Sequence, residues 1–286
     1  MVSALILAAT LAFTETDARN AYEIAVEFTG NFTPRDAGTF GGRSAANYIL
    51  DAVSARGADA WLDRWTAKTP LGEKLFTNVE CEFVYGPELP WIVLVSHYDT
   101  KMGVACPGAN DGASTTALLI QLARELYLKG PQKCNIQLLW TDGEEAFKAY
   151  GPDDGFWGSR HAAEKWKKSG RKVRAVICLD MLGDKDLKIT IPGNVTPGLK
   201  KAVLRVASHL GYADKVVASK ELVKDDHVAF LEAGFKAITL IDFEYGSKPG
   251  LNDYWHTPRD TVENISDKSL FIAGNICVTL LNGLCR

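Results

Sequence analysis

The chain has 286 residues, of which 47% are hydrophobic and 23% are charged, so it is long and apolar enough to build a sizeable globular core. Its formal net charge of −3 gives no indication of nucleic acid or an anionic membrane as a partner. No internal repeat, low-complexity tract or Pro/Ser-rich linker divides the sequence, which favours a single domain.

The chain opens on an apolar run at residues 2–13. The run is too short to cross a bilayer, so no transmembrane span is expected there. It resembles the hydrophobic region of a signal peptide, although no Lys or Arg precedes it, and a buried first helix or strand is the alternative. We therefore expect residues 1–16 to be a signal-peptide remnant or an N-terminal extension and residues 17–286 to form the domain. A secreted or periplasmic location is the first expectation, and a cytoplasmic one is the alternative.

The first third of the chain predicts two helices and two strands. Thr16 or Asp17 is a suitable N-cap for a helix that runs to about Phe28. A loop rich in Gly, Thr and Pro follows, and a second helix is predicted at residues 44–55. The strands, with a turn between them, are predicted at residues 60–67 and 76–85.

The remaining two thirds alternate apolar strands with amphipathic helices. The strands are continuous apolar runs, at residues 91–96, 136–140, 173–179 and 237–241. The helices are predicted at residues 114–128, 159–168, 197–210, 226–233 and 266–284. Apolar strands without alternation, separated by such helices, predict an α/β fold with a mainly parallel sheet covered on both faces. Sheets of this kind bind ligands at the carboxyl ends of their strands.

Six cysteines lie at positions 81, 106, 134, 178, 277 and 285. No two are close enough for a CxxC zinc or redox motif. Cys134, Cys178 and Cys277 lie in apolar stretches and are expected to be small core residues. The sequence leaves a disulfide open, but the spacing assigns no pair.

Titratable side chains follow the ends of the strong strands. Those that come directly after a strand are His97, Glu144, Glu145 and Asp180. Asp111 lies in a Gly-rich loop that leads into a helix, and His256 lies in a loop after the fourth strand. Each of them alone has a structural explanation, such as a buried His or a helix-capping Asp. Together they are expected to converge, because the carboxyl ends of parallel strands meet at one edge of the sheet.

Convergence of these side chains would create an electrostatic problem. Two carboxylates about 4 Å apart repel by roughly 4 kcal/mol at an effective dielectric constant of about 20. No Lys or Arg in these motifs is positioned to neutralise Asp111, Glu145 and Asp180 together. A divalent metal would do so, and His with carboxylate ligands suits zinc. An Asp can bridge two such ions. Asp99 is expected to hold the far ring nitrogen of His97.

Six motifs in chain order resemble the zinc-dependent metallopeptidase family of bacterial leucyl aminopeptidases and animal-type glutaminyl cyclases. They are His97-Tyr98-Asp99, Gly108-Ala109-Asn110-Asp111, Asp142-Gly143-Glu144-Glu145, Leu179-Asp180-Met181-Leu182-Gly183, Asp225-Asp226-His227 and Trp255-His256-Thr257. The resemblance covers nearly the whole chain from Asp17 onwards. It implies a three-layer α/β/α sandwich of the zinc-exopeptidase type, with a mixed, largely parallel sheet, and peptide or protein N-termini as substrates.

The resemblance also implies roles for individual residues. The first zinc would be held by Asp111, Glu145 and His256. A second zinc, where present, would be held by His97 and Asp180, with Asp111 bridging the two ions. Glu144 would be the general acid/base. In a cyclase of this family, Asp180 and Asp226 would hold the substrate amine and tune Glu144, and Trp255 with Tyr150 or Trp157 would wall the pocket.

Local signals divide between the two branches of the family. Residues 142–161 resemble the cyclases without a gap, and Trp255 before His256 is also cyclase-like. Tyr150, however, stands where animal cyclases carry Trp, and residues 110–114 are closer to the peptidase form. We expect a glutaminyl-peptide cyclotransferase with one zinc, which converts N-terminal Gln to pyroglutamate and releases ammonia. The alternative is an aminopeptidase with two zincs, which hydrolyses the first peptide bond. A non-catalytic peptide-binding module is a third hypothesis, disfavoured by the complete ligand set.

Overall fold

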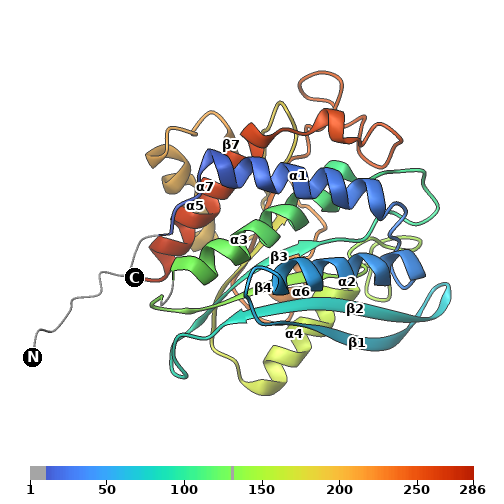
Figure 1. Cartoon of the computed structure of the whole chain (residues 1–286), viewed down its shortest axis with the longest axis horizontal. Helices are drawn as coiled ribbons and strands as arrows, with labels where there is room; N and C mark the ends of the chain where they lie inside the picture. The colour runs from blue at the N-terminus through green and yellow to red at the C-terminus, as the bar shows by residue number, and fades with distance from the viewer. Residues whose placement is uncertain (1–10, 130–131) are drawn as a thin grey trace, which may run out of the picture.

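A sheet of eight strands lies between two layers of helices in the computed structural model, which describes residues 11–129 and 132–286 (Figure 1). The strands are β1 Ala60–Thr69, β2 Gly72–Phe83, β3 Trp91–His97, β4 Asn135–Thr141, β5 Val173–Asp180, β6 Ile189–Ile191, β7 Val216–Ala218 and β8 Ala237–Ile241. Their order across the sheet is β1-β2-β4-β3-β5-β8-β6-β7. The central strands β4, β3, β5 and β8 are parallel, whereas β1–β2, β2–β4 and β6–β8 pair antiparallel. The sheet is therefore mixed with a parallel centre, as the sequence and the family resemblance predict.

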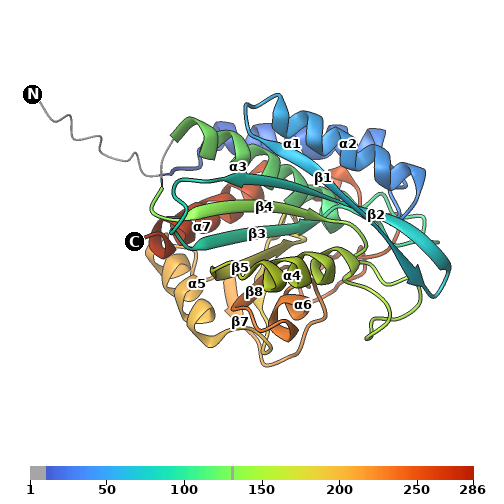
Figure 2. The ribbon, with the colours of Figure 1, turned by 90° about the horizontal axis from the view of Figure 1, so that it is seen from below.

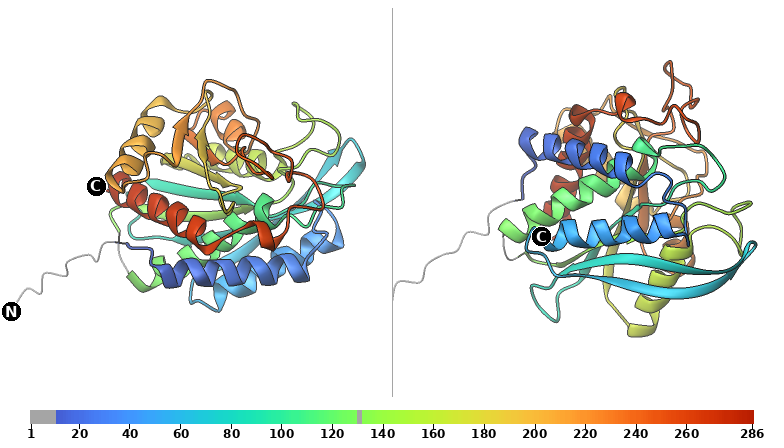
Figure 3. Two further views of the ribbon diagram at one scale, coloured as in Figure 1. Left: turned by 90° about the horizontal axis from the view of Figure 1, so that it is seen from above. Right: turned by 45° about the vertical axis from the view of Figure 1, so that its right-hand side comes forward.

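The helices cover both faces of this sheet, as Figure 2 shows from below. They are α1 Glu15–Asn31, α2 Phe40–Ser54, α3 Thr115–Lys129, α4 Trp157–Ser169, α5 Pro197–His209, α6 His227–Glu232 and α7 Asp267–Leu284. The layer that contains α1, α2 and α3 also includes α7, with α5 packed beside it (Figure 3). The opposite face is covered by α4 and α6. The expected α/β/α sandwich is thus confirmed.

Strand β3 illustrates why the apolar runs do not alternate. Ile92 and Leu94 belong to the larger core cluster, on the side of α1 and α3. Val93 and Val95 belong to the smaller cluster, on the side of α4 and α6. All four side chains are 0% exposed, because helices cover both faces of the strand.

The helix caps differ from the expectation at the N-terminal end of the domain. Thr14, not Thr16 or Asp17, caps α1: its hydroxyl accepts from the backbone N–H of Asp17 at 3.2 Å. Asp17 is instead the reciprocal member of a capping box, because its carboxylate accepts from the N–H of Thr14 at 2.8 Å. The predicted N-cap was therefore wrong by two to three residues.

Helix α2 begins four residues before its expected start. Thr39 caps it by accepting from the N–H of Gly42 at 3.2 Å. The glycines of the first turn look like a loop in the sequence, but they permit close packing. A Cβ atom at Gly41 would lie 2.2 Å from the carbonyl oxygen of Pro34. Close packing against the preceding loop, rather than helix propensity, explains the glycines at this helix start.

The described part of the chain is folded before the expected boundary at Asp17. Leu11 and Phe13 are buried, and the side-chain amide of Asn282 donates to the carbonyl oxygen of Leu11 at 2.9 Å. The ring of Phe13 packs against Gly274 of α7, where an added Cβ would lie 2.3 Å from it. The end of the apolar run 2–13 is thus part of the core, and residues 2–10 lie outside the described residues.

The structure assigns a disulfide that the spacing left open. Cys134 is buried, as expected, and it forms a disulfide with Cys285. The two residues are separated by 151 positions in sequence, so spacing alone gives no signal for the pair. Cys178 and Cys277 are free and buried, as expected.

Among residues 11–129 and 132–286, no helix is both long and apolar enough to cross a membrane.

Candidate active site

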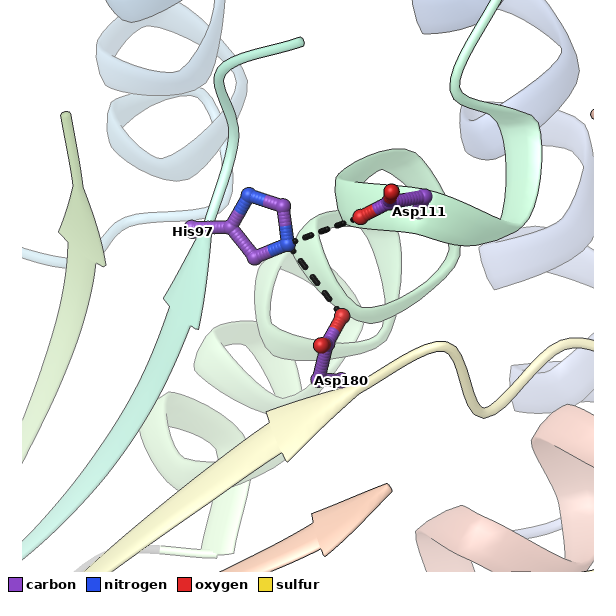
Figure 4. Close-up of side chains that lie close together, drawn as sticks. All are labelled: His97, Asp111 and Asp180. Atoms are coloured by element: carbon purple, nitrogen blue, oxygen red, sulfur yellow. Dashed lines mark hydrogen bonds and ion pairs between the residues drawn. The ribbon is translucent and has the colours of Figure 1, made fainter. Parts of the chain in front are cut away.

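The predicted convergence occurs at the carboxyl edge of the parallel strands. His97 is the last residue of β3 and Asp180 is the last residue of β5. Thr141, the last residue of β4, lies level with His97 in the register of the sheet. Figure 4 shows His97 between the carboxylates of Asp111 and Asp180. The imidazole Nε2 lies 3.1 Å from Asp111 Oδ1 and 3.2 Å from Asp180 Oδ1.

A sharp turn after β4 presents Glu144 and Glu145. Gly143 has a φ of 77°, a left-handed conformation that glycine adopts without strain. The carboxylate of Asp99 accepts from the backbone N–H groups of Glu144 and Glu145, both at 3.2 Å. Asp99 was expected to bond His97 instead, but its Oδ1 lies 3.6 Å from Nδ1 of that ring, too far for a hydrogen bond. Asp99 therefore anchors the turn rather than the imidazole.

Asp111 is presented by a kinked turn, η1 (Ala109–Ser114), that precedes α3. The turn is kinked at Asp111 (φ −81°, ψ 94°) and at Gly112 (φ 93°), which departs from helical geometry. The kink directs the carboxylate between two histidines. Its Oδ1 faces His97, and its Oδ2 lies 3.2 Å from Nε2 of His256. Such a position is the one a bridging ligand needs.

Two clusters of ligand atoms share Asp111. His97, Asp111 and Asp180 form the first, and Asp111, Glu145 and His256 form the second, each with ligand atoms within 4.8 Å of one another. In the second cluster, Nε2 of His256 lies 2.5 Å from Oε1 of Glu145. The structure thus brings together all five residues that the sequence predicted as metal ligands. Imidazole nitrogen with carboxylate oxygen is a donor set that fits zinc.

The crowded carboxylates raise the pKa values of both histidines. Burial acts to lower the pKa of His97, but the charges and hydrogen bonds of Asp180 and Asp111 outweigh it, so the pKa is well above its usual value. For His256, burial also opposes the shift, yet hydrogen bonds to Asp111 and Glu145 raise the pKa to about 10. The site therefore favours positive charge, as a cation-binding site does.

The carboxylates of the site also respond to one another. Burial, followed by the charge of Glu145, raises the pKa of Glu144 well above its usual value. Burial raises the pKa of Asp180 to about 7, although His97 acts in the opposite direction.

Lys101, which sequence reasoning missed, pairs with Glu145 at 3.3 Å, Nζ to Oε2. It lies two residues after Asp99, just outside the His97-Tyr98-Asp99 motif, and this proximity in sequence was the only signal for it.

A cavity of about 320 Å³ opens onto these side chains. Its lining residues are Asp111, Glu144, Glu145, Tyr150, Asp180, Leu222, Val223, Lys224, Ile241, Phe243 and Trp255. Tyr150 and Trp255 were predicted as walls of the pocket. Trp157 is not among the lining residues and stacks instead on Phe76, with ring centroids 5.3 Å apart. The loop of residues 222–224 and Phe243 carry no motif and were missed.

Tyr150 does more than line the cavity. Its hydroxyl oxygen lies 3.0 Å from Oε2 of Glu144 and 2.9 Å from Oε2 of Glu145. Lys101 lies over the same ring, with Nζ 5.2 Å from its centroid. The Tyr in place of Trp therefore places one hydroxyl donor within hydrogen-bond distance of both carboxylates of the turn.

Asp225 and Asp226 lie behind the cavity. Asp226 is buried and accepts from the hydroxyl of Thr141 at 2.6 Å, and burial together with Asp225 raises its pKa to about 7. It does not line the cavity. Asp225, which sequence reasoning did not single out, accepts from the hydroxyl of Thr239 and from the N–H of Asp226. The pair adds negative charge near Glu144 without opening onto the pocket.

Comparisons with known proteins agree with this geometry. The family model described as "Peptidase family M28" matches residues 82–281. The glutaminyl-peptide cyclotransferase of Drosophila melanogaster is 29% identical over 262 residues, which cover 81% of this chain and 72% of that protein. A crystal structure of an Acidobacteriales bacterium glutaminyl cyclase has a TM-score of 0.89 and 33% identity, and covers 100% of this chain and 99% of that one.

A Zn-dependent exopeptidase from Parabacteroides distasonis shares the fold, with a TM-score of 0.84 and 24% identity, covering 95% of this chain and 99% of that one. The resemblance inferred from the six motifs is confirmed at the level of the family. Because the family model spans residues 82–281 of 286, the chain is an enzyme that belongs to peptidase family M28.

Proposed function

We propose that this enzyme is a zinc-dependent glutaminyl-peptide cyclotransferase, which closes an N-terminal Gln into pyroglutamate and releases ammonia. The observation that carries the proposal is the 33% identity to the Acidobacteriales glutaminyl cyclase over the whole chain. The exopeptidase from Parabacteroides distasonis, at 24% identity, supports only the fold. The cyclase-like segment 142–161 and Trp255 support the same assignment.

The second cluster described above is the proposed zinc site. Asp111, Glu145 and His256 bring two carboxylate groups and an imidazole nitrogen within 4.8 Å of one another. When bound, zinc supplies a Lewis acid that polarises the γ-amide carbonyl of the substrate glutamine. A single ion is sufficient for the cyclisation, because no water has to be activated as a nucleophile.

Glu144 is the proposed general acid/base. It takes a proton from the α-amine, whose nitrogen attacks the carbonyl carbon of the γ-amide and forms the ring C–N bond. The γ-amide C–N bond then breaks, and Glu144 returns the proton to the departing nitrogen, which leaves as ammonia. The raised pKa of Glu144, caused by burial and Glu145, makes this carboxylate a stronger base than an exposed glutamate.

The other predicted residues position the substrate. Asp180 lines the cavity and is proposed to hold the α-amine. Asp226, which lies behind the cavity, is proposed to act on Glu144 through its charge. The aromatic rings of Trp255, Tyr150 and Phe243 exclude water from the reacting atoms, so that ring closure is favoured over hydrolysis.

The aminopeptidase alternative rests on one observation. The two ligand clusters share Asp111, so the site has donors for a second ion, at His97 and Asp180. Paired ions are a known arrangement for hydrolysis. In that case Glu144 would deprotonate a water molecule rather than an amine.

Mass spectrometry of two peptides distinguishes these functions. The zinc-loaded enzyme is incubated with a peptide that begins with Gln and with a matched peptide that begins with Leu. Loss of ammonia from the Gln peptide, with the chain intact, is the expected result. Release of free Leu or Gln would instead establish the aminopeptidase and overturn the proposal.

We also propose that the enzyme is exported. The Cys134–Cys285 disulfide supports this proposal, because disulfides persist in oxidising compartments such as the periplasm or the cell exterior. Fractionation of cells that express the full chain, with an antibody against the enzyme, is the direct measurement. Recovery in the cytoplasmic fraction alone would contradict it.

A further inference from the structure

Arg35 is fully buried and gives its donors to backbone carbonyl groups around the Asp111 turn. Its Nε donates to the oxygen of Tyr98 at 2.5 Å, and its Nη1 donates to the oxygen of Pro107 at 2.8 Å. Its Nη2 donates to Gly108 at 2.6 Å and to Asp111 at 3.2 Å. The planar guanidinium therefore binds three backbone carbonyl groups of the Asp111 loop and one carbonyl group, that of Tyr98, directly after β3.

Asp260 holds the amide side of the same loop. It is 0% exposed, and its Oδ1 and Oδ2 accept from the backbone N–H groups of Asn110 at 2.7 Å and Asp111 at 3.1 Å. The hydroxyl of Tyr245 donates to Oδ1 at 2.9 Å and fixes the carboxylate. A cation at the carbonyl oxygens and an anion at the amides match the polarity of the peptide groups between them, so both charges stabilise this loop conformation.

Asp260 also connects the two loops that carry the shared ligand cluster. It lies four residues after His256 in the chain, while its carboxylate binds the backbone of the Asp111 turn. The backbone around Gly108 is closely packed. A Cβ atom at Gly108 would lie 2.6 Å from Nη2 of Arg35 and 2.8 Å from the oxygen of Asp111. The separation of Asp111 and His256 therefore depends on these buried contacts.

We propose that Arg35 and Asp260 form a clamp that sets the spacing of Asp111 and His256 and thereby the affinity of the enzyme for zinc. This inference rests on the proposed zinc site. Neither residue lines the cavity, so both are positioning residues that act through the backbone of the turn. The competing explanation is that the clamp only stabilises the fold.

Zinc affinity and stability are measured separately to test the clamp. The variants are Arg35→Lys, which keeps the charge but loses the fork, Asp260→Asn, and Tyr245→Phe, which removes one hydroxyl. Arg259→Ala is the matched control, because Arg259 is exposed in the same loop and pairs with Asp253. Zinc dissociation constants come from competition with a chromophoric chelator, and urea unfolding of the metal-stripped protein gives the stability.

We expect Arg35→Lys and Asp260→Asn to raise the zinc dissociation constant by about tenfold or more, as loss of outer-shell contacts does in other metal sites. Tyr245→Phe should raise it about two- to fivefold. Arg259→Ala should bind zinc like the unmodified enzyme. This pattern would support the clamp.

Unchanged zinc affinity in folded Arg35→Lys and Asp260→Asn, with stability alone reduced, would overturn the proposal in favour of the purely structural role. If those two variants do not fold, the zinc dissociation constant of Tyr245→Phe decides between the two explanations. An unchanged dissociation constant in Tyr245→Phe would likewise overturn the proposal. Failure of the unmodified enzyme to bind zinc would instead overturn the zinc site itself, and the clamp with it. The two failures are therefore distinguishable.

Discussion

Glu144 and Glu145 are neighbours in the chain but have different surroundings. Glu145 lies 2.5 Å from the imidazole of His256 and pairs with Lys101, so its carboxylate contacts two basic side chains. Glu144 belongs to neither ligand cluster and opens onto the cavity. The structure therefore gives the two carboxylates of one turn different surroundings, as the proposed roles of ligand and acid/base require.

Replacement of Glu144 by Gln should remove the proton carrier and leave the ligands in place. We expect kcat for the Gln peptide to fall by about 10²–10⁴-fold, the usual contribution of a general acid/base. Zinc content, measured by elemental analysis, should stay the same. Glu145→Gln is the matched control and should lose zinc as well as activity. Substantial turnover by Glu144→Gln would show that another group carries the proton.

Replacement of Tyr150 by Phe tests the donor that serves both glutamates. The ring still walls the cavity, so KM should change little, whereas Glu144 loses a hydrogen bond worth about 1.5 kcal/mol or more for a charged acceptor. We expect kcat to fall about tenfold. Tyr127→Phe, at an exposed position on α3, is the control. An unchanged kcat in Tyr150→Phe would mean that the hydroxyl plays no part in turnover.

The residues at strand ends were predictable from the sequence, whereas contacts made by loops were not. His97 and Asp180 end buried strands, and the rule that parallel strands share a carboxyl edge places them together. Tyr150 and Lys101 reach Glu145 from irregular segments whose conformation leaves no periodic pattern in the sequence. The expected bond between Asp99 and His97 failed for the same reason, since the turn of residues 143–145 takes up the carboxylate.

At the scale of elements, long periodic segments were predicted and short ones were missed. All the predicted helices and strands are present, with shifted ends. Strands β6 and β7 have three residues each, too few for an apolar pattern, and antiparallel pairing of β6 with β8 brings them into the sheet. Helix α2 starts early because its glycines pack against the loop that directly precedes it, a contact that propensity does not encode.

The loop of residues 222–224 forms one wall of the cavity mouth and carries a cation. Leu222 is 76% exposed there, and Nζ of Lys224 donates to the carbonyl oxygen of Tyr150 at 3.2 Å. No carboxylate pairs with Lys224 in the part of the chain that the structure describes. We therefore expect Lys224 to favour substrates that carry a negative charge next to the N-terminal residue.

Reversal of this charge should reverse the preference for the second residue of the peptide. With the native loop, we expect kcat/KM to be about two- to fivefold higher for Gln-Glu than for Gln-Lys peptides, the range of an exposed ion pair. Lys224→Glu should invert the ratio, and both preferences should fade in high salt. Lys201→Glu, an exposed change on α5, should leave the ratio unchanged. Equal rates for both peptides with the native enzyme would remove Lys224 from substrate selection without affecting the assignment as a cyclase.

At the scale of the whole molecule, the candidate active site and the disulfide lie at opposite edges of the sheet. The carboxyl edge of β3, β4 and β5 holds the reactive side chains. The opposite edge is where Cys134, directly before β4, is joined to Cys285, directly after α7. The disulfide therefore ties the C-terminal helix to the centre of the sheet at a distance from the chemistry. Sequence spacing did not reveal the pair, because it depends on how α7 packs across the fold.

This separation predicts that the disulfide contributes to stability and not to catalysis. Closing a loop across 151 residues restricts the unfolded chain, and such a cross-link is worth about 2–5 kcal/mol. The double variant Cys134→Ala/Cys285→Ala should therefore unfold at a clearly lower urea concentration. Its kcat at 25 °C should stay within about twofold of the unmodified enzyme, because a small change at a distant site leaves the reacting groups in place. Reduction of the unmodified enzyme should lower its stability to a similar degree, and Cys277→Ala, which removes a buried free thiol, should cost only about 1 kcal/mol. Loss of activity in the double variant under conditions where circular dichroism shows it folded would mean that the packing of α7 is transmitted to the carboxyl edge, and that the two edges are not independent.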